Sequence, residues 1–193
     1  MPPKFKFTRA EIVQAALDLT RESGISAVTA RGLGARLGSS AKPIFGLFEN
    51  MEEVQQEVRK AADELYQRRI RDEMESGKYP PYKASGIAYI RFAKEEKELF
   101  KLLFMRDRSH EAAENSHEQI RPLIQLIRQN TGLSEEEAFR FHIEMWVYVH
   151  GIATMIVTSY LDWDMDFVNE VLTDGYIGLK YRYCGKGKND GSD

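Results

Sequence analysis

The stretch from Leu33 to Phe48, LGARLGSSAKPIFGLF, constrains the fold more than any other part of the sequence. Gly34 and Gly38 lie four residues apart, and two serines follow before a second apolar run begins. A helix-turn-helix needs a small residue where its second helix crosses the first, and a glycine at the turn, where φ is positive. The stretch therefore predicts two short helices joined by a tight turn, with a purely structural helical corner as the alternative.

The second of these helices is expected over residues 41–47. Ser40 is its expected N-cap, and Pro43 fits at the third helical position, where the backbone has no intrahelical partner to lose. Ile44 and Phe48 are expected to face inward. The outward face would then present Ala41, Lys42, Phe45 and Gly46. Small side chains and one long cation at a helix N-terminus suit entry into the major groove of DNA.

Helix signals continue along the whole chain. Thr8 with Glu11 and Ser134 with Glu137 form capping boxes, and YPPY at 79–82 is the strongest break. Helices are expected over about 8–23, 30–37, 41–47, 51–76, 83–106 with room for a kink, 116–130 with Pro122 limiting its start, 134–161 and 166–182. No strand pattern competes, so the predicted fold class is all-α with about nine helices. The apolar helix after Ser134 is expected to be buried on all sides, one of them by a partner subunit.

Composition places the chain among ordinary globular proteins, since 42% of its 193 residues are hydrophobic and 30% are charged. Cys184 is the one cysteine, which fits a reducing compartment. The N-terminal residues lack an apolar signal region. The most apolar stretch, 145–161, is short for a membrane span of about 20 residues. We therefore expect a cytoplasmic protein.

The charge is unevenly distributed. Residues 1–50 hold seven Lys and Arg against four Asp and Glu, a net charge of +3, whereas the whole chain carries −3. The remainder is therefore at −6. A basic head on an acidic body is typical of a DNA-binding head joined to a separate sensing or assembly domain.

Residues 8–54 resemble the DNA-binding head of tetracycline-repressor-like (TetR/AcrR) transcriptional regulators. The matching residues are Ile12, Ala15, Ala16, Leu19, Gly24, Thr29, Arg31, Leu33, Leu37, Gly38, Ser40, Ile44, Phe45, Phe48 and Glu53. The segments 80–105 and 145–158 are similar to the C-terminal domain of one branch of the family, which carries a tryptophan, a histidine and a glycine, here Trp146, His150 and Gly151.

This resemblance implies a three-helix helix-turn-helix head fused to a helical ligand-binding and dimerisation domain. The expected boundaries are 1–50 for the head, 51–185 for the body and 186–193 for a flexible tail. The implied function is a ligand-responsive regulator, with repression as the expected mode, that binds a palindromic double-stranded DNA operator as a homodimer. The implied effector is small and mostly apolar, and no membrane partner is expected.

The expected site residues form three groups. Those expected to bind DNA are Lys4, Lys6, Arg9, Thr29, Arg31, Ser39, Ser40, Ala41, Lys42 and Phe45, helped by backbone N–H groups at helix N-termini. Those expected to line the effector pocket are Tyr89, Phe92, Phe104, Met105, Phe141, Met145, Trp146 and Val149. Those expected at the dimer interface are Ile152, Met155, Ile156, Ser159, Val168, Val171 and Leu172. No cofactor, metal or catalytic residue is expected. His142 and His150 are not expected to bind zinc, and His150 is expected to be a buried, hydrogen-bonded histidine.

Several departures from the family pattern leave alternatives open. The family usually has a tyrosine at Phe45, and often a histidine at Leu47 and a lysine at Met51, each of which contacts a phosphate. Gly34 is commonly alanine, and a helical glycine costs about 1 kcal/mol. The first alternative is therefore a helical small-molecule-binding protein whose DNA binding is weakened or lost. The second is an α-helical enzyme, to which no residue can be assigned.

Overall fold

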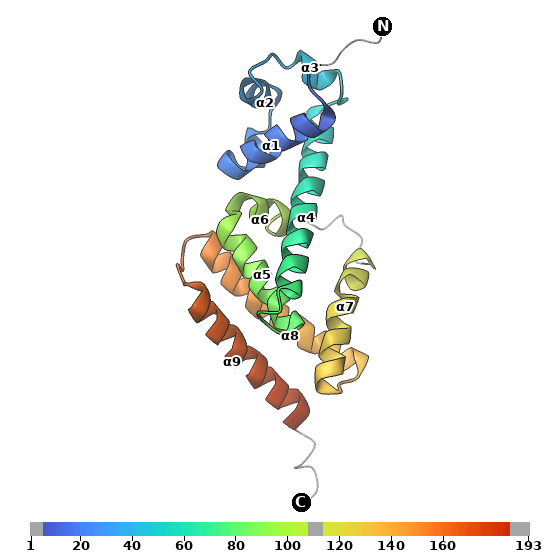
Figure 1. Cartoon of the computed structure of the whole chain (residues 1–193), viewed down its shortest axis with the longest axis vertical. Coiled ribbons are helices and arrows are strands. Elements are labelled where there is room, and N and C mark those ends of the chain that lie inside the picture. Colours follow the sequence, from blue (N-terminus) through green and yellow to red (C-terminus); the bar gives the residue numbers. More distant parts are fainter. Residues whose placement is uncertain (1–5, 108–113, 186–193) are drawn as a thin grey trace, which may run out of the picture. The chain divides into compact units, whose positions relative to one another are not determined.

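The structure, a computed structural model, describes residues 6–107 and 114–185 (Figure 1). Within these residues the chain forms nine α-helices, one short 3-10 turn at Ile25–Ala27 and no strand, so the predicted all-α class is confirmed. The helices are α1 (Arg9–Ser23), α2 (Ala30–Arg36), α3 (Lys42–Phe45), α4 (Met51–Glu75), α5 (Pro81–Glu95), α6 (Lys97–Phe104), α7 (Glu114–Thr131), α8 (Glu135–Val157) and α9 (Met165–Cys184).

Both predicted capping boxes are present. The Thr8 hydroxyl accepts a hydrogen bond from the backbone N–H of Glu11, and the Glu11 carboxylate accepts one from the backbone N–H of Thr8 at 2.7 Å. Ser134 and Glu137 repeat the arrangement at the start of α8. These hydrogen bonds lower the pKa of both glutamates, which keeps the carboxylates ionised beside the helix N-termini.

Two helix predictions need correction. The helix expected over 83–106 is divided into α5 and α6, because Glu96 between them leaves helical geometry with φ −124° and ψ 53°. The Glu96 carboxylate accepts two hydrogen bonds, of 2.9 and 3.1 Å, from the guanidinium of Arg21. Pro122 lies inside α7 and does not limit the start of that helix. The buried residues Ile124 and Ile127 hold this part of α7 against the core despite the hydrogen bond that proline cannot make.

The chain divides into two compact units. The first comprises residues 1–68 and 95–106, and so contains α1–α3, most of α4, and α6. The second comprises residues 69–94 and 107–193, and contains the end of α4, α5 and α7–α9. The first unit is larger than the expected 1–50 head because α6 packs against α1, where the Arg21–Glu96 pair lies.

The first unit has a small, mostly apolar core. Ile12 and Ala16 of α1 are completely buried, as are Leu33 of α2 and Ile44 of α3, with Val54 and Val58 of α4 completing the core.

The second unit is built around α8, which packs on α7 and α9 (Figure 1). Ile124 and Ile127 of α7 meet Ala138, Phe141 and Met145 of α8 in one buried cluster. Between α8 and α9 the contact is close at Gly175, where an added Cβ would lie 2.9 Å from the ring of Tyr148. In the described parts of the chain, no helix is long and apolar enough to cross a membrane.

Candidate functional site

The predicted helix-turn-helix geometry is present between α2 and α3. A Cβ added at Gly34 would lie 3.0 Å from the backbone oxygen of Ser39, and the N–H of Ser39 donates to the Gly34 carbonyl at 2.9 Å. Gly38 has a φ of 59°, the left-handed conformation that glycine adopts most easily. The two glycines thus stand at the close crossing and at the turn, as their spacing predicts.

A third glycine, which the sequence did not single out, fixes the entry into α2. A Cβ at Gly32 would lie 2.6 Å from the backbone oxygen of Ala27, so no larger residue fits without a backbone shift. The N–H of Gly32 donates to the hydroxyl of Thr29, the predicted N-cap of α2, at 3.1 Å. The close approach of Gly32 to Ala27 joins residues five apart across the 3-10 turn, and helix periodicity does not reveal such a contact.

Helix α3 is shorter than predicted and starts later. Its N-cap is Ala41, with no side-chain cap, so the prediction of Ser40 as N-cap is wrong. Pro43 occupies the second helical position, and a proline early in the helix replaces a capping side chain because it needs no hydrogen-bond acceptor. Ile44 and Phe48 are buried as predicted, whereas the Phe45 side chain is 48% exposed.

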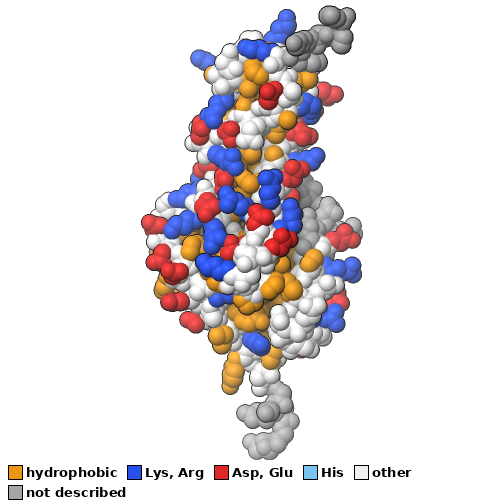
Figure 2. All heavy atoms as spheres, in the orientation of Figure 1, with side chains coloured by type: hydrophobic (Ala, Val, Ile, Leu, Met, Phe, Trp, Pro, Cys, Tyr) orange, Lys and Arg blue, Asp and Glu red, His pale blue; other side chains and the backbone are white. Residues whose placement is uncertain are grey.

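Two cations lie free on this part of the head. Lys42 and Arg31 are exposed, and neither forms an ion pair with any described residue. Ser40 and Thr29 are also exposed, and Ser39 and Ala41 are half-buried. Figure 2 shows Lys and Arg interspersed with Asp and Glu over the visible face. Any contact with an anion would therefore depend on particular cations rather than on a continuous basic surface.

Three further cations predicted to bind DNA differ in their surroundings. Lys6 is exposed, with its ammonium 5.2 Å from the centre of the Phe7 ring. Lys4 lies outside the described residues. Arg9 is exposed but is hydrogen-bonded to other residues: it donates to the Leu47 carbonyl at 2.6 Å and to Glu53 at 2.8 Å. These contacts tie the start of α1 to the segment between α3 and α4, which is a structural role.

The second unit contains two partly buried tyrosine–histidine pairs between α5 and α8. The hydroxyl of Tyr82 lies 3.1 Å from Nδ1 of His142, and that of Tyr89 lies 2.7 Å from Nδ1 of His150. Trp146 stacks on His150 with ring centres 5.1 Å apart and planes inclined by 16°. Both histidines are thus hydrogen-bonded, as expected for His150, and the pairs bring polar atoms among the apolar residues of α5 and α8.

Burial controls the ionisation of these groups. It lowers the pKa of His142 to about 4 and raises the pKa of Tyr82 well above its ordinary value. Burial lowers the pKa of His150 as well. At neutral pH Tyr82 and the two histidines are therefore uncharged.

The predicted pocket residues fall into two separate sets. Tyr89, Phe92, Phe141, Met145 and Val149 are buried in the second unit, and Trp146 is 45% exposed there. Phe104 and Met105 belong to the first unit, where Phe104 packs against Tyr66 and Phe100 with ring centres 5.0 Å apart in both cases. The structure therefore groups the α5 and α8 residues in one unit and leaves Phe104 and Met105 outside it.

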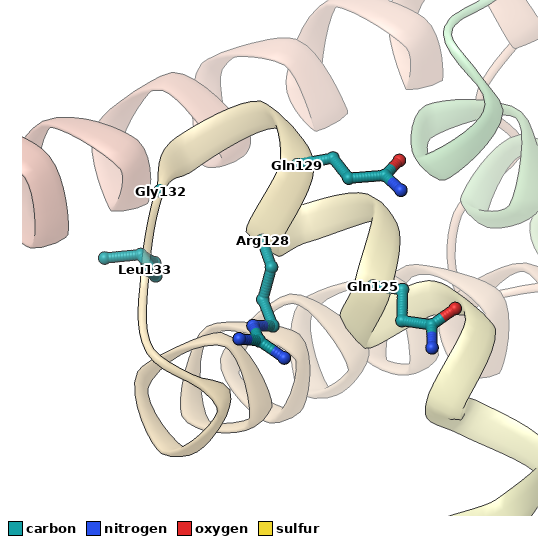
Figure 3. Close-up of a pocket in the computed structure, with 5 residues that line it drawn as sticks. All are labelled: Gln125, Arg128, Gln129, Gly132 and Leu133. Carbon is teal, nitrogen blue, oxygen red and sulfur yellow. The ribbon is translucent and has the colours of Figure 1, made fainter.

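A surface hollow of about 420 Å³ lies at the end of α7 and does not involve the predicted pocket (Figure 3). Gln125, Arg128 and Gln129 line it with Gly132 and Leu133. Figure 3 shows Gln125 and Gln129 pointing to one side and Arg128 and Leu133 elsewhere. The hollow is largely open and its side chains do not converge, so it is not a formed binding site.

Helix α8 leaves an apolar face that its own chain does not cover, on a helix of which one side is expected to be buried by a partner subunit. We call this the α8 face; its large side chains are Ile143, Trp146, Val147, Tyr148 and Met155, with Val147 the most exposed at 59%. Gly151 lies among them, and a Cβ there would meet nothing within 4 Å. On α9, Phe167, Ile177 and Tyr181 are exposed as well.

The residues expected at the dimer interface overlap this surface only in part. Met155 and Ser159 are exposed and Val171 is half-buried. The other four are buried within the chain and are unavailable to a partner without repacking. They are Ile152, Ile156, Val168 and Leu172. Helical periodicity identified the apolar residues of α8 and α9 but not which side of each helix its own chain covers.

Comparison with known families agrees with this architecture. Residues 82–175, from α5 into α9, match the model of the tetracyclin repressor-like C-terminal domain. No curated protein matches the chain. The match covers the unit with the tyrosine–histidine pairs, and the helix-turn-helix geometry stands before it in the sequence. The chain therefore carries a tetracycline-repressor-like C-terminal domain, which supports its membership of that family of transcriptional regulators.

Proposed function

We propose that the protein is a ligand-responsive repressor that binds a palindromic operator in double-stranded DNA as a homodimer in the cytoplasm. The observation that carries the proposal is the pair of unneutralised cations, Lys42 and Arg31, on the exposed side of a tightly packed helix-turn-helix. Exposed cations on such a motif favour phosphate contacts, which supply much of the affinity for DNA. Ser39, Ser40 and Ala41 are small enough to let α3 approach base edges.

Dimerisation is supported by the α8 face. Several large apolar side chains lie exposed along one helix, and contiguous apolar surface of this kind marks a protein–protein contact. We propose that α8 and α9 pair with their copies in a four-helix bundle through these exposed side chains. Two copies of α3 would then meet successive major grooves about one helical turn apart.

Effector binding is proposed for the second unit. Tyr89 and His150 offer hydrogen-bonding groups among the buried aromatic residues of α5 and α8. Such an interior suits a small, mostly apolar molecule with one polar group. Binding would favour a spacing of the two heads that does not fit the operator, which requires that the effector bind that state more tightly.

A binding selection tests the proposal. The full chain is incubated with a random-sequence duplex library, and the affinity for the selected duplex is measured by fluorescence anisotropy at several salt concentrations. We expect one enriched inverted repeat, and affinity that falls steeply with salt. Lys42→Ala should lower the salt slope by about one per half-site, whereas Lys60→Ala, which removes an exposed lysine of α4, should leave it unchanged.

A second candidate function rests on a specific observation. The exposed ring of Phe45 has no hydroxyl to donate to a phosphate, which favours a small-molecule-binding protein with weakened DNA binding. If no sequence is enriched and the Lys42 and Lys60 variants behave alike, the regulator proposal fails and this alternative stands.

A further inference from the structure

Phe45 is the one large hydrophobic side chain that the described part of the head, residues 6–50, leaves exposed. The two nearest large apolar residues do not share this exposure, since Ile44 on α3 is completely buried and Phe48, just after α3, is 2% exposed. The core beneath α3 is thus filled by Ile44 and Phe48. The ring of Phe45 has no place in it and projects to the outside.

The surroundings of Phe45 point to a nucleic-acid partner rather than a protein one. Lys42 precedes it by three residues, which puts both side chains on one side of α3, and Lys42 is exposed without an ion pair among the described residues. Ser40 and Ala41 add only small side chains beside them. A single aromatic ring next to a free cation matches the phosphate backbone and the base edges of a groove better than a broad apolar protein surface.

An aromatic ring without a hydroxyl can make only apolar contacts on the floor of a major groove. The apolar group that B-DNA presents there is the 5-methyl of thymine, and phenylalanine is among the side chains that contact it. Cytosine, adenine and guanine present polar edges in the same groove, which would leave the ring without a favourable contact.

We infer that Phe45 is a specificity-determining residue that reads the 5-methyl group of one thymine in each operator half-site. The inference rests on the proposed function and deepens it. The deviation from tyrosine at this position then exchanges a phosphate contact for a base contact, so the head loses a sequence-independent interaction and gains a sequence-dependent one.

The test replaces thymine by deoxyuridine, which removes the methyl group and keeps base pairing. Each thymine of the selected duplex is replaced in turn, in both half-sites, and affinity for the full chain is measured at fixed salt. At one position per half-site, replacement should weaken binding about fourfold per half-site, the order expected for one buried methyl group. The other thymines should tolerate the change.

Three variants test whether Phe45 causes the discrimination between thymine and uracil. Phe45→Ala should bind the thymine and uracil duplexes equally, whereas Phe45→Tyr, which keeps the ring, should still discriminate. Lys42→Ala should weaken binding to both duplexes by the same factor and retain the discrimination. Circular dichroism checks that each variant keeps its helical content, which an exposed position should allow.

The outcomes separate this inference from the proposed function. A selected operator whose thymines all tolerate uracil overturns the inference and leaves the function standing, as does discrimination that persists in Phe45→Ala. If the selection enriches no DNA sequence, the proposed function is overturned, and so is the inference that Phe45 contacts a thymine methyl group.

Discussion

The head helices α1–α3 and the helix α8 bury their large apolar side chains to different extents. Within the described residues 6–50, Phe45 is the one large hydrophobic side chain that the chain itself leaves exposed. Along α8, five large hydrophobic side chains remain exposed, and Val147 is the most open of them. A segment that buries its apolar surface needs no partner to fold, whereas one that leaves a contiguous face open is completed by another surface. The contrast separates a region that buries its own apolar side chains from a region whose exposed face, in our proposal, is covered by a second copy of the chain.

The largest expected effect comes from charging the α8 face. Val147→Glu would place an unpaired carboxylate in the proposed interface, which should weaken the dimer by on the order of a hundredfold in its dissociation constant. Sedimentation velocity over a concentration series measures the shift from dimer to monomer.

The matched control is Gln125→Glu, which adds the same charge at an exposed position of α7 and should leave the dimer intact. Equal dimer dissociation constants for Val147→Glu and Gln125→Glu would mean that the α8 face is not the dimer interface. The contrast between head and body would then need another explanation.

The next largest effect concerns the tight packing of the head. Gly32→Ala would drive a Cβ to 2.6 Å from the Ala27 carbonyl and should destabilise the protein by about 1–3 kcal/mol. Gly34→Ala meets its nearest backbone atom at 3.0 Å and also gains about 1 kcal/mol of helix propensity, so it should be much closer to neutral. Urea unfolding compares the two, and a Gly32→Ala variant as stable as the original chain contradicts the account.

Lowering the pH should have a smaller effect, a loss of stability that originates in the second unit. The pKa of His142 lies at about 4 in the folded chain, below its ordinary 6.5, so the unfolded chain binds the proton more readily between these values. The associated stability is therefore present above pH 6.5 and is lost as the pH falls towards 4. Between pH 7 and pH 5 the loss should be on the order of 2 kcal/mol.

Urea unfolding at the two pH values measures this loss in the full chain and in His142→Gln. The substitution should reduce the dependence without abolishing it, because burial shifts the pKa of His150 in the same direction. An identical dependence in both proteins would show that His142 is not buried as described.

The smallest effect separates structure from DNA contact at Arg9. Because its side chain is 45% exposed, the ion pair with Glu53 contributes little, and loss of the hydrogen bonds in Arg9→Ala should cost about 1 kcal/mol of stability. The salt slope of DNA binding should stay the same, unlike that of Lys42→Ala. If Arg9→Ala lowers the salt slope of DNA binding and leaves the free energy of unfolding unchanged, Arg9 contacts DNA as first predicted.

The fold was predictable wherever local chemistry decides it. The capping boxes of Thr8 and Ser134, and the two glycines of the α2–α3 turn, act within a few residues, so the sequence alone locates them. The break at Glu96 was not predictable, because it accompanies a contact with Arg21, 75 residues away.

The site was predictable to a lesser extent for the same reason. Exposure of Lys42 and Phe45 follows from the burial of Ile44 between them, a local pattern. The role of Arg9 depends on the Leu47 carbonyl, 38 residues on, and the pairing of Tyr82 with His142 joins residues 60 apart. No spacing rule connects such positions.

The central claim is that two heads, held together by the bodies, meet two half-sites of one operator. The most direct measurement counts the chains bound per duplex by native mass spectrometry, using the selected operator and the same duplex with one half-site scrambled. The account predicts two chains on the intact inverted repeat and loss of specific binding when one half-site is scrambled. One chain per duplex with full affinity for a single half-site would contradict it.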